Sequence, residues 1–140
     1  MNWQEANEFI EKLNKKRCCG YSDWRLPRIK ELYSLIDETQ YNPALPQDHP
    51  FININPNWYW CWSSSTLAYN TDSAWLVSIH YGYVNSISKS SRLRVWPVRT
   101  GQCRTAGNSP RFFDNGDGTV TDKNTGLMWT KDANIQDDKP

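Results

Sequence analysis

The chain has 140 residues, of which 22% are charged and 14% aromatic, and its formal net charge is +1. This length suits a single domain with its own hydrophobic core. The near-neutral balance argues against non-specific binding to nucleic acid, which needs a basic excess, and no apolar run approaches the ~18 residues of a membrane span.

The first third of the sequence predicts two helices. Apolar residues from Trp3 to Leu13 follow helical spacing, and Asn2 with Glu5 resembles a capping box, so we expect a helix over residues 3–14. A second apolar stripe, with Pro27 in a first helical position, predicts a helix over about residues 27–37. The N-terminal segment is amphipathic and does not look like a signal peptide, so any export signal would lie outside this sequence.

The middle of the chain predicts strands after a long irregular segment. Residues 38–57 contain four prolines and several asparagines, which is typical of a loop. Alternating apolar and polar residues then predict strands over residues 58–63, 75–79, 83–87 and 93–98. Pro97 indicates an edge or a bulge in the last of these.

Three tryptophans, Trp58, Trp60 and Trp62, occupy alternate positions of the first predicted strand. Alternate side chains of a strand point to the same face. We expect Trp62 to be buried, Trp60 to be largely buried and Trp58 to be partly exposed. The row as a whole is therefore interpreted as a wall of the core, with Trp58 alone available to a ligand.

The C-terminal part predicts a polar linker followed by a small meander. Residues 100–111 are polar, and residues 112–130 carry Asn-Gly, Asp-Gly and Thr-Gly turn signals between short β-prone stretches. This pattern predicts three short strands joined by two tight turns.

Four cysteines, Cys18, Cys19, Cys61 and Cys103, and only two histidines argue against a zinc site, since no Cys-x-x-Cys is present. Adjacent Cys18 and Cys19 rarely bond each other, so one of them could pair with Cys103 in an oxidising compartment. Free buried thiols are the alternative.

Four stretches of the sequence resemble one family of bacterial domains. They are G-Y-S-D-W-R-L-P-R-I-K-E-L-Y-S-L-I-D at 20–37, C-W-S-S-S at 61–65, A-W-L-V-S-I-H-Y-G-Y-V at 74–84 followed by Ser88-Lys89-Ser90, and D-N-G-D-G-T-V-T-D-K-N-T-G-L-M-W at 114–129. Together they cover most of the chain and are similar to the C-terminal domain of the Legionella collagen-like adhesin. The resemblance implies a C-type-lectin-like α+β fold with two helices packed on twisted antiparallel sheets.

The order of these elements departs from the family. The T-G-L-M-W element opens the family domain, whereas here it stands last, as in a circular permutation or a cut out of phase from tandem copies. We therefore expect one domain with a main body at 1–99, a linker at 100–111 and the displaced element at 112–140. The 112–130 segment should pair with the 93–98 strand within one molecule, and a swap between two chains is the rival arrangement. Ile10 and Pro97 occupy positions where the family often has cysteines, so that bridge would be missing.

Candidate ligand-binding residues follow the second predicted hairpin or lie in turns. Lys89, Arg92 and Arg94 could bind sulfate or carboxylate groups, and the resemblance supports this, since the adhesin domain binds sulfated polysaccharides. The alternative is a solvated strand face. Further candidates with amphipathic or polar side chains are Tyr69, Asn70, His80, Tyr81 and Trp58.

Two motifs are interpreted as structural. Asp23-Trp24-Arg25-Leu26-Pro27 should form a turn with Trp24 buried and with Asp23 and Arg25 bonded locally. Asp114 and Asp117 resemble part of a calcium loop but lack the longer ligand series that ends in Glu, so a hairpin turn is the better interpretation.

These observations favour a non-catalytic recognition or adhesion module, secreted or on the cell surface, that binds an acidic or sulfated polysaccharide. No cofactor is expected, and no carboxylate pair or Ser-His-Asp order indicates an enzyme. The alternative is a protein-binding or assembly module, a possible homo-oligomer, of the diversified C-type-lectin-like kind. Neither nucleic acid nor insertion into a membrane is expected.

Overall fold

The computed structural model describes residues 1–54, 60–101 and 111–134. Two α-helices and two antiparallel sheets make up this part of the chain, which confirms the α+β class. The predictions for Trp58, for Cys103 and for most of the 100–111 linker fall outside the described residues.

Helix α1 (Trp3–Lys15) forms where the sequence predicts it, because its N-terminus is capped locally. The Asn2 side chain accepts the Glu5 N–H at 2.8 Å, and the Glu5 carboxylate accepts the Asn2 N–H at 2.9 Å. A short 3₁₀ turn, η1 (Cys18–Gly20), follows it.

Helix α2 (Ile29–Tyr33) is much shorter than the predicted 27–37. Its expected first turn is extended because Arg25 pairs with Val98 and the Pro27 carbonyl accepts the Ser64 N–H at 2.8 Å. Tertiary pairing thus overrides the local preference of this stretch for helix.

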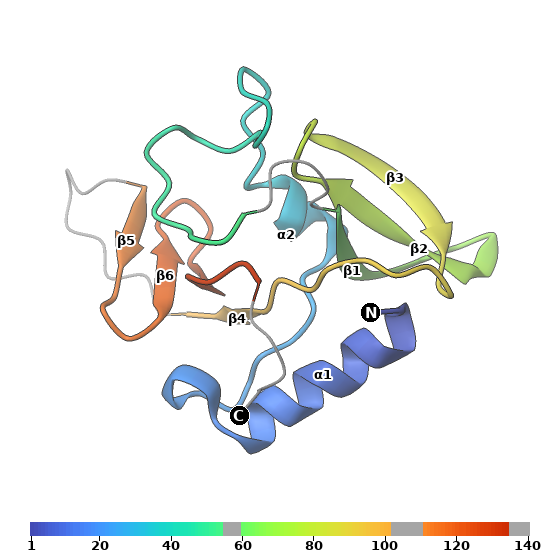
Figure 1. Cartoon of the computed structure of the whole chain (residues 1–140), viewed down its shortest axis with the longest axis horizontal. Helices are drawn as coiled ribbons and strands as arrows, with labels where there is room; N and C mark the ends of the chain where they lie inside the picture. The colour runs from blue at the N-terminus through green and yellow to red at the C-terminus, as the bar shows by residue number, and fades with distance from the viewer. Residues whose placement is uncertain (55–59, 102–110, 135–140) are drawn as a thin grey trace.

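The first sheet contains β1 (Trp60–Leu67), β2 (Asn70–Ser78) and β3 (Tyr83–Ser88) in the order β1-β2-β3, so β3 is an outer strand. Strand β3 is close to the predicted 83–87, whereas β1 extends beyond the predicted end at residue 63 and β2 begins five residues before the predicted 75–79. Figure 1 shows this sheet on the opposite side of α2 from β4, β5 and β6.

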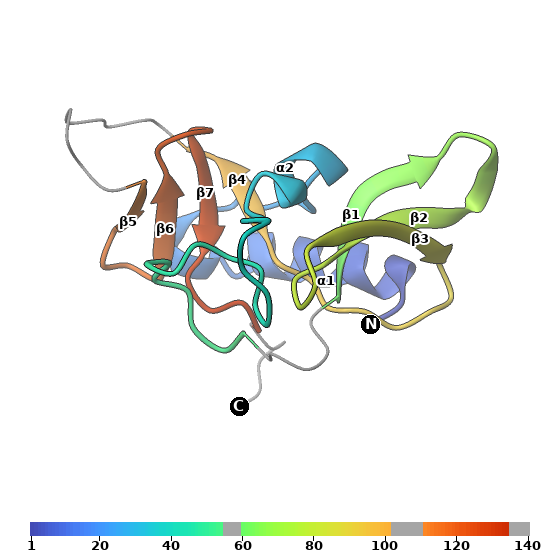
Figure 2. The same ribbon diagram turned by 90° about the horizontal axis from the view of Figure 1, so that it is seen from above.

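The second sheet joins the end of the main body to the C-terminal segment. It contains β4 (Val98–Thr100), β5 (Phe112–Asp114), β6 (Thr119–Asp122) and β7 (Leu127–Thr130) in the order β4-β7-β6-β5. The register pairs Val98 with Trp129 and Thr100 with Leu127. The predicted meander and its pairing with the end of the main body are confirmed (Figure 2).

The predicted strand over residues 93–98 is wrong in extent. Only Val98 belongs to β4, whereas Arg94 forms a parallel bridge with Cys61 beside the first sheet. The stretch runs between the two sheets and gives each of them one short contact, so it cannot be a continuous strand of either.

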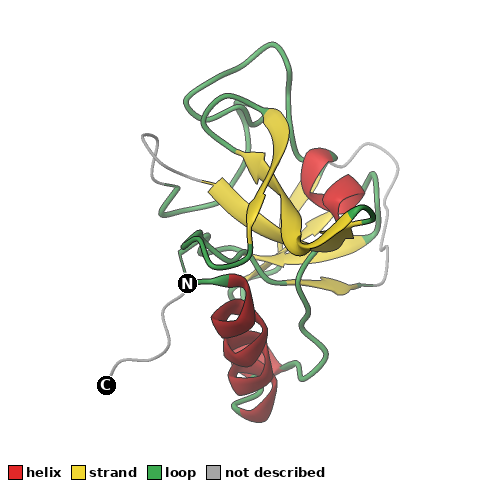
Figure 3. Ribbon diagram, turned by 90° about the vertical axis from the view of Figure 1, so that its right-hand side faces the viewer, coloured by secondary structure: helices red, strands yellow, loops and turns green. Residues whose placement is uncertain are grey.

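The central parts of β1 and β2 are buried on both faces, and alternate residues pack into different cores. Trp62 and Leu76 join the cluster under α1, whereas Cys61 and Val77 join the cluster shared with α2 and the second sheet. Trp62 is fully buried, as expected, and Trp60 packs half-buried at the edge of the α1 cluster. Figure 3 shows α1 lying outside the strands.

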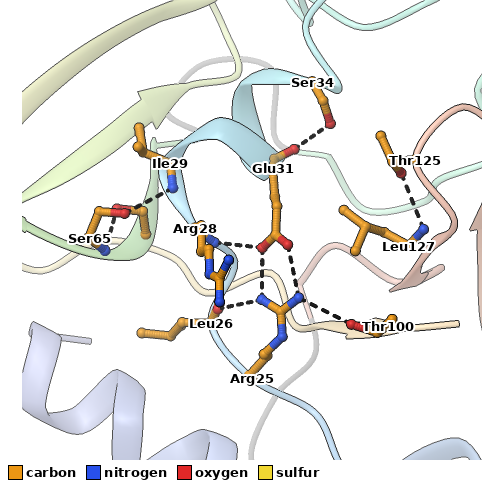
Figure 4. Close-up of polar contacts among 11 residues, drawn as sticks. Arg25, Leu26, Arg28, Ile29, Glu31, Ser34, Ser65, Thr100, Thr125 and Leu127 are labelled. Atoms are coloured by element: carbon orange, nitrogen blue, oxygen red, sulfur yellow. Dashed lines mark hydrogen bonds and ion pairs between the residues drawn. The ribbon is translucent and has the colours of Figure 1, made fainter.

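The D-W-R-L-P element is architectural, and Trp24 is buried as predicted. The Arg25 guanidinium donates two hydrogen bonds, of 2.7 and 2.9 Å, to the Glu31 carboxylate, and Figure 4 shows this pair beneath α2. The expectation of a local partner is wrong for Asp23. Its carboxylate accepts hydrogen bonds from Arg99 at 2.6 and 3.1 Å, which ties this turn to β4.

Candidate functional site

Two candidate surfaces lie at opposite ends of the β1–β3 sheet. The basic end comprises Lys89 and Arg92 with Tyr69 and Asn70, and the aromatic end comprises His80, Tyr81, Tyr83 and Tyr41. Strand β2 separates them, because Asn70 begins this strand and His80 follows its last residue by two positions. The structure therefore does not bring the sequence candidates into one site.

The backbone fixes Lys89 at the basic end. Its N–H donates to the Asp72 carbonyl at 2.8 Å, and its carbonyl accepts the Trp3 N–H at 3.0 Å. The Lys89 ammonium lies over the Trp3 ring, 4.1 Å from the centroid. A cation held on an indole face keeps its charge directed at solvent while its stem packs.

Arg92 is the most exposed cation of the basic end, with 72% of its side chain accessible. Its nearest acid is Glu5, at 3.4 Å, but that carboxylate already accepts the Asn2 N–H in the capping box. The Asn2 N–H, and to a smaller degree Arg92, lower the pKa of Glu5. An exposed pair of this length contributes little, so an incoming anion can displace Glu5 from Arg92.

Arg94 points away from the basic end. Its guanidinium donates to the side-chain carbonyl of Asn134, and its backbone bonds Trp60 and Trp62. The side chain is half-buried. Through these contacts Arg94 has a structural role, because it joins Asn134, the last described residue, to β1.

Tyr69 lies in the β1–β2 turn and Asn70 begins β2, at the same end of the sheet as Lys89. Tyr69 is 84% exposed, the highest value among the large apolar side chains of the described residues. The Asn70 side chain accepts the Asp72 N–H at 3.2 Å. Both residues are exposed to solvent, at the end of the sheet where Lys89 bonds to Asp72.

The aromatic end is a group of rings around the β2–β3 turn. His80 and Tyr81 meet edge to face with centroids 4.1 Å apart, and Tyr81 stacks on Tyr83 at 6.0 Å with an interplanar angle of 8°. Tyr81 is 61% exposed and Tyr83 is 39% exposed. Stacked rings with polar tips in water resemble a contact surface more than a core.

The loop over residues 37–44 holds this turn in place. The Asn42 N–H donates to the His80 carbonyl, and the Ala44 N–H donates to the Ile79 carbonyl, both at 2.7 Å. Gly82 has a φ of +81°, and a Cβ there would lie 2.9 Å from the Ala44 Cβ. The aromatic end is therefore pre-ordered by backbone contacts.

Two of its residues, Tyr83 and Tyr41, were missed as candidates from the sequence. Tyr41 is 72% exposed and directly precedes Asn42, which bonds His80. The Tyr-Gly-Tyr motif at 81–83 could have indicated Tyr83 as a candidate, since a tight glycine turn brings its flanking side chains together. No pattern in the sequence links Tyr41 to the turn.

Asp114 ends β5 and Asp117 lies in the turn between β5 and β6, and both side chains stabilise that turn. Asp114 accepts the Gly116 N–H at 2.9 Å and pairs with Lys131 at 2.8 Å, and these contacts, Lys131 first, lower its pKa. Asp117 accepts the Thr119 N–H at 3.0 Å. Residues 1–54, 60–101 and 111–134 hold no group of three or more His, Cys, Asp or Glu side chains arranged for a metal ion.

No curated protein and no solved structure matches the chain, and no helix among the described residues is long and apolar enough to cross a membrane. The model of the Lcl C-terminal domain matches residues 1–99. Since that match covers well over half of the sequence, the chain belongs to the Lcl C-terminal domain family and is an adhesin-like module.

Proposed function

We propose that this domain is a non-catalytic recognition module, secreted or displayed at the cell surface, whose basic end binds an acidic or sulfated polysaccharide. The observation that carries the proposal is that Lys89 and Arg92 contact residues of the first turn of α1, Trp3 and Glu5. One cation is fixed on an indole face and the other is 72% exposed.

The positive charge is concentrated at the basic end and is not a property of the whole chain. The whole chain carries a formal charge of +1, so long-range attraction to a polyanion is weak. At the basic end, Arg92 pairs with Glu5 and the Lys89 ammonium lies over Trp3, and the N-terminal end of a 13-residue helix adds a partial positive charge. A guanidinium offers paired donors to a sulfate or carboxylate, and Tyr69 provides a flat surface for a sugar ring at the same end.

Heparin-affinity chromatography at stepped salt tests the proposal. Wild-type protein should be retained at low salt and released as exposed charges are screened. The double variant Lys89→Ala, Arg92→Ala should elute close to the void. The matched control, Lys15→Ala with Lys30→Ala, removes two exposed cations elsewhere and should stay near wild type. Equal retention of the basic-end variant and the wild type would overturn the proposal.

The aromatic end supports a second function, which is protein binding or assembly. The stacked Tyr81 and Tyr83 rings and the ordered turn beneath them fit a protein contact. Sedimentation velocity tests self-association through this surface. The wild type should show a salt-insensitive, concentration-dependent complex that Tyr81→Ser with Tyr83→Ser abolishes. If the protein stays monomeric at every concentration, self-association through the aromatic end is excluded, and the proposal of heparin binding is unaffected.

We also propose that the domain is a C-type-lectin-like fold whose opening element has moved to its end. Two observations support this: the family match stops at residue 99, and β7 of the C-terminal segment pairs with β4 of the main body. A rearranged chain with residues 111–140 placed before Met1 should fold with the same near-ultraviolet circular dichroism. Loss of that signal would count against the permutation.

A further inference from the structure

Two adjacent thiols lie together on the 3₁₀ turn after α1. The sulfur atoms of Cys18 and Cys19 are 3.7 Å apart, and both side chains are partly exposed. Cys19 adopts a left-handed backbone conformation, with φ 57° and ψ 19°. Among the cysteines of the described residues, only Cys61 is fully buried.

Hydrogen bonds from both sides hold the turn that presents this pair. The Trp24 indole N–H donates to the Cys18 carbonyl at 2.9 Å, and the Gly20 N–H donates to the Arg17 carbonyl at 2.8 Å. Trp24 is itself in the core. The two sulfurs are therefore juxtaposed by a turn anchored to the main body.

The pair also touches the C-terminal segment. A Cβ built on Gly118, in the β5–β6 turn, would lie 2.9 Å from the Cys19 sulfur. Glycine at this position lets the turn close over the thiol. The dithiol thus sits where the displaced element meets the main body.

We propose that Cys18 and Cys19 form a modification site that reacts with a low-molecular-weight disulfide and closes to a vicinal disulfide. The Cys18 thiolate attacks one sulfur of the oxidant, forms a mixed disulfide and releases one thiolate of the reagent. Cys19 then attacks the Cys18 sulfur, loses its proton to solvent and releases the second thiolate. One disulfide and two protein thiols become one protein disulfide and two small thiols.

The order of attack follows from the surroundings of Cys19. Burial first, then the neighbouring Cys18 sulfur and Asp117, raise the pKa of Cys19 to about 12, so it is not the initial nucleophile. Part of that rise comes from Cys18 itself and disappears once Cys18 is in a neutral mixed disulfide. Capture of the oxidant by Cys18 therefore removes one of the contributions that raise the pKa of Cys19, while the larger effect of burial remains.

The resulting bond should be easy to reduce. Neighbouring Cα atoms are held ~3.8 Å apart by a trans peptide, whereas disulfides span about 4.4–6.8 Å, and departures from that range store strain. Closure must also draw the sulfurs from 3.7 Å to roughly 2.05 Å. A strained, accessible bond of this kind is a reversible modification rather than a structural staple.

Peptide mapping after exposure to oxidised glutathione tests the proposal on the intact protein. Trypsin cleaves after Arg17 and Arg25, so both thiols fall in one peptide, C-C-G-Y-S-D-W-R. We expect this peptide to become lighter by about 2 Da, the two hydrogen atoms lost on closure, and to resist alkylation until dithiothreitol is added.

Matched variants separate this bond from its rivals. Cys103→Ser should close as the wild type does, whereas Cys18→Ser and Cys19→Ser should leave one alkylatable or glutathionylated thiol. A cross-link between this peptide and T-G-Q-C-R, which contains Cys103, would overturn the proposal. So would a stable glutathione adduct on the wild-type peptide without closure, and this outcome appears in the wild type regardless of how the variants fold.

Discussion

Replacing Asp122 with asparagine should destabilise the domain by about 3 kcal/mol. Asp122 lies in β6 with no exposed surface, and its two carboxylate oxygens each accept a hydrogen bond of 2.9 Å from Arg111. The same guanidinium donates to the Ser34 carbonyl at 2.6 Å. The pair therefore connects the C-terminal segment to the end of α2.

The magnitude follows from what asparagine keeps. A hydrogen bond to a charged group contributes about 1.5–3 kcal/mol, and the asparagine oxygen can still accept one of the two. The new amide N–H₂ then faces a guanidinium that is only 24% exposed and no longer neutralised. With an unfolding entropy of about 2.1 cal/mol/K per residue, 140 residues convert a loss of ~3 kcal/mol into a fall in Tm of about 10 °C.

Urea denaturation followed by tryptophan fluorescence measures this difference, since a shift in midpoint at constant slope reports stability alone. Asp114→Asn is the matched control. Asp114 pairs with Lys131 at 2.8 Å, but its side chain is 37% exposed, so its loss should cost less than about 1 kcal/mol. If Asp122→Asn loses no more than Asp114→Asn, the C-terminal segment is not docked through this pair.

Three other comparisons probe the same architecture. Trp96→Phe should cost about 1–2 kcal/mol more than Trp129→Phe in urea denaturation, because the Trp96 indole N–H donates to a buried carbonyl at 3.0 Å, whereas that of Trp129 has no hydrogen-bond acceptor in the described part of the chain; equal losses would contradict this. Gly82→Ala should lower Tm more than Gly116→Ala, since both residues have φ near +80° but an added Cβ meets an atom at 2.9 Å only at Gly82; a reversed order would show that the loop behind Gly82 yields. Although burial opposes the shift, hydrogen bonds lower the pKa of Glu31 below its usual 4.5, so the stability this residue adds is complete above that pH and is lost as pH falls through the lower folded value. Glu31→Gln should flatten the acid limb of the curve of unfolding free energy against pH, and an unchanged limb would contradict this.

Local signals in the sequence predicted the elements whose stabilising contacts are also local. The capping box of Asn2 and Glu5 is satisfied within four residues, so α1 could be placed almost to the residue. The Asn-Gly and Asp-Gly turns likewise predicted the β5–β6–β7 meander. The predicted length of α2 was too great. The apolar stripe does not reveal that Arg25, just before the predicted helix, forms a backbone bridge with Val98, 73 positions later.

The candidate site depended on register, which the sequence leaves open. Lys89, Arg92 and Arg94 read as one basic run, yet the side chain of Arg94 is bonded to Asn134, 40 positions away. Tyr69 and Tyr81 both looked like turn residues, and only the pairing of β2 with its neighbours shows that they stand at opposite ends of a sheet. The link between Asp23 and Arg99 spans 76 positions and has no local signature.

The length of β2 has a consequence for how the module would work in an array. Its nine residues span eight steps of about 3.3 Å, which places its two ends roughly 26 Å apart, too far for one monosaccharide or one short side chain to bridge. If both proposed functions hold, each end would bind its own ligand, and a single copy would link a glycan strand to a neighbouring protein. Repeated copies would then gain avidity from being linked, with no change in the affinity of either end for its ligand.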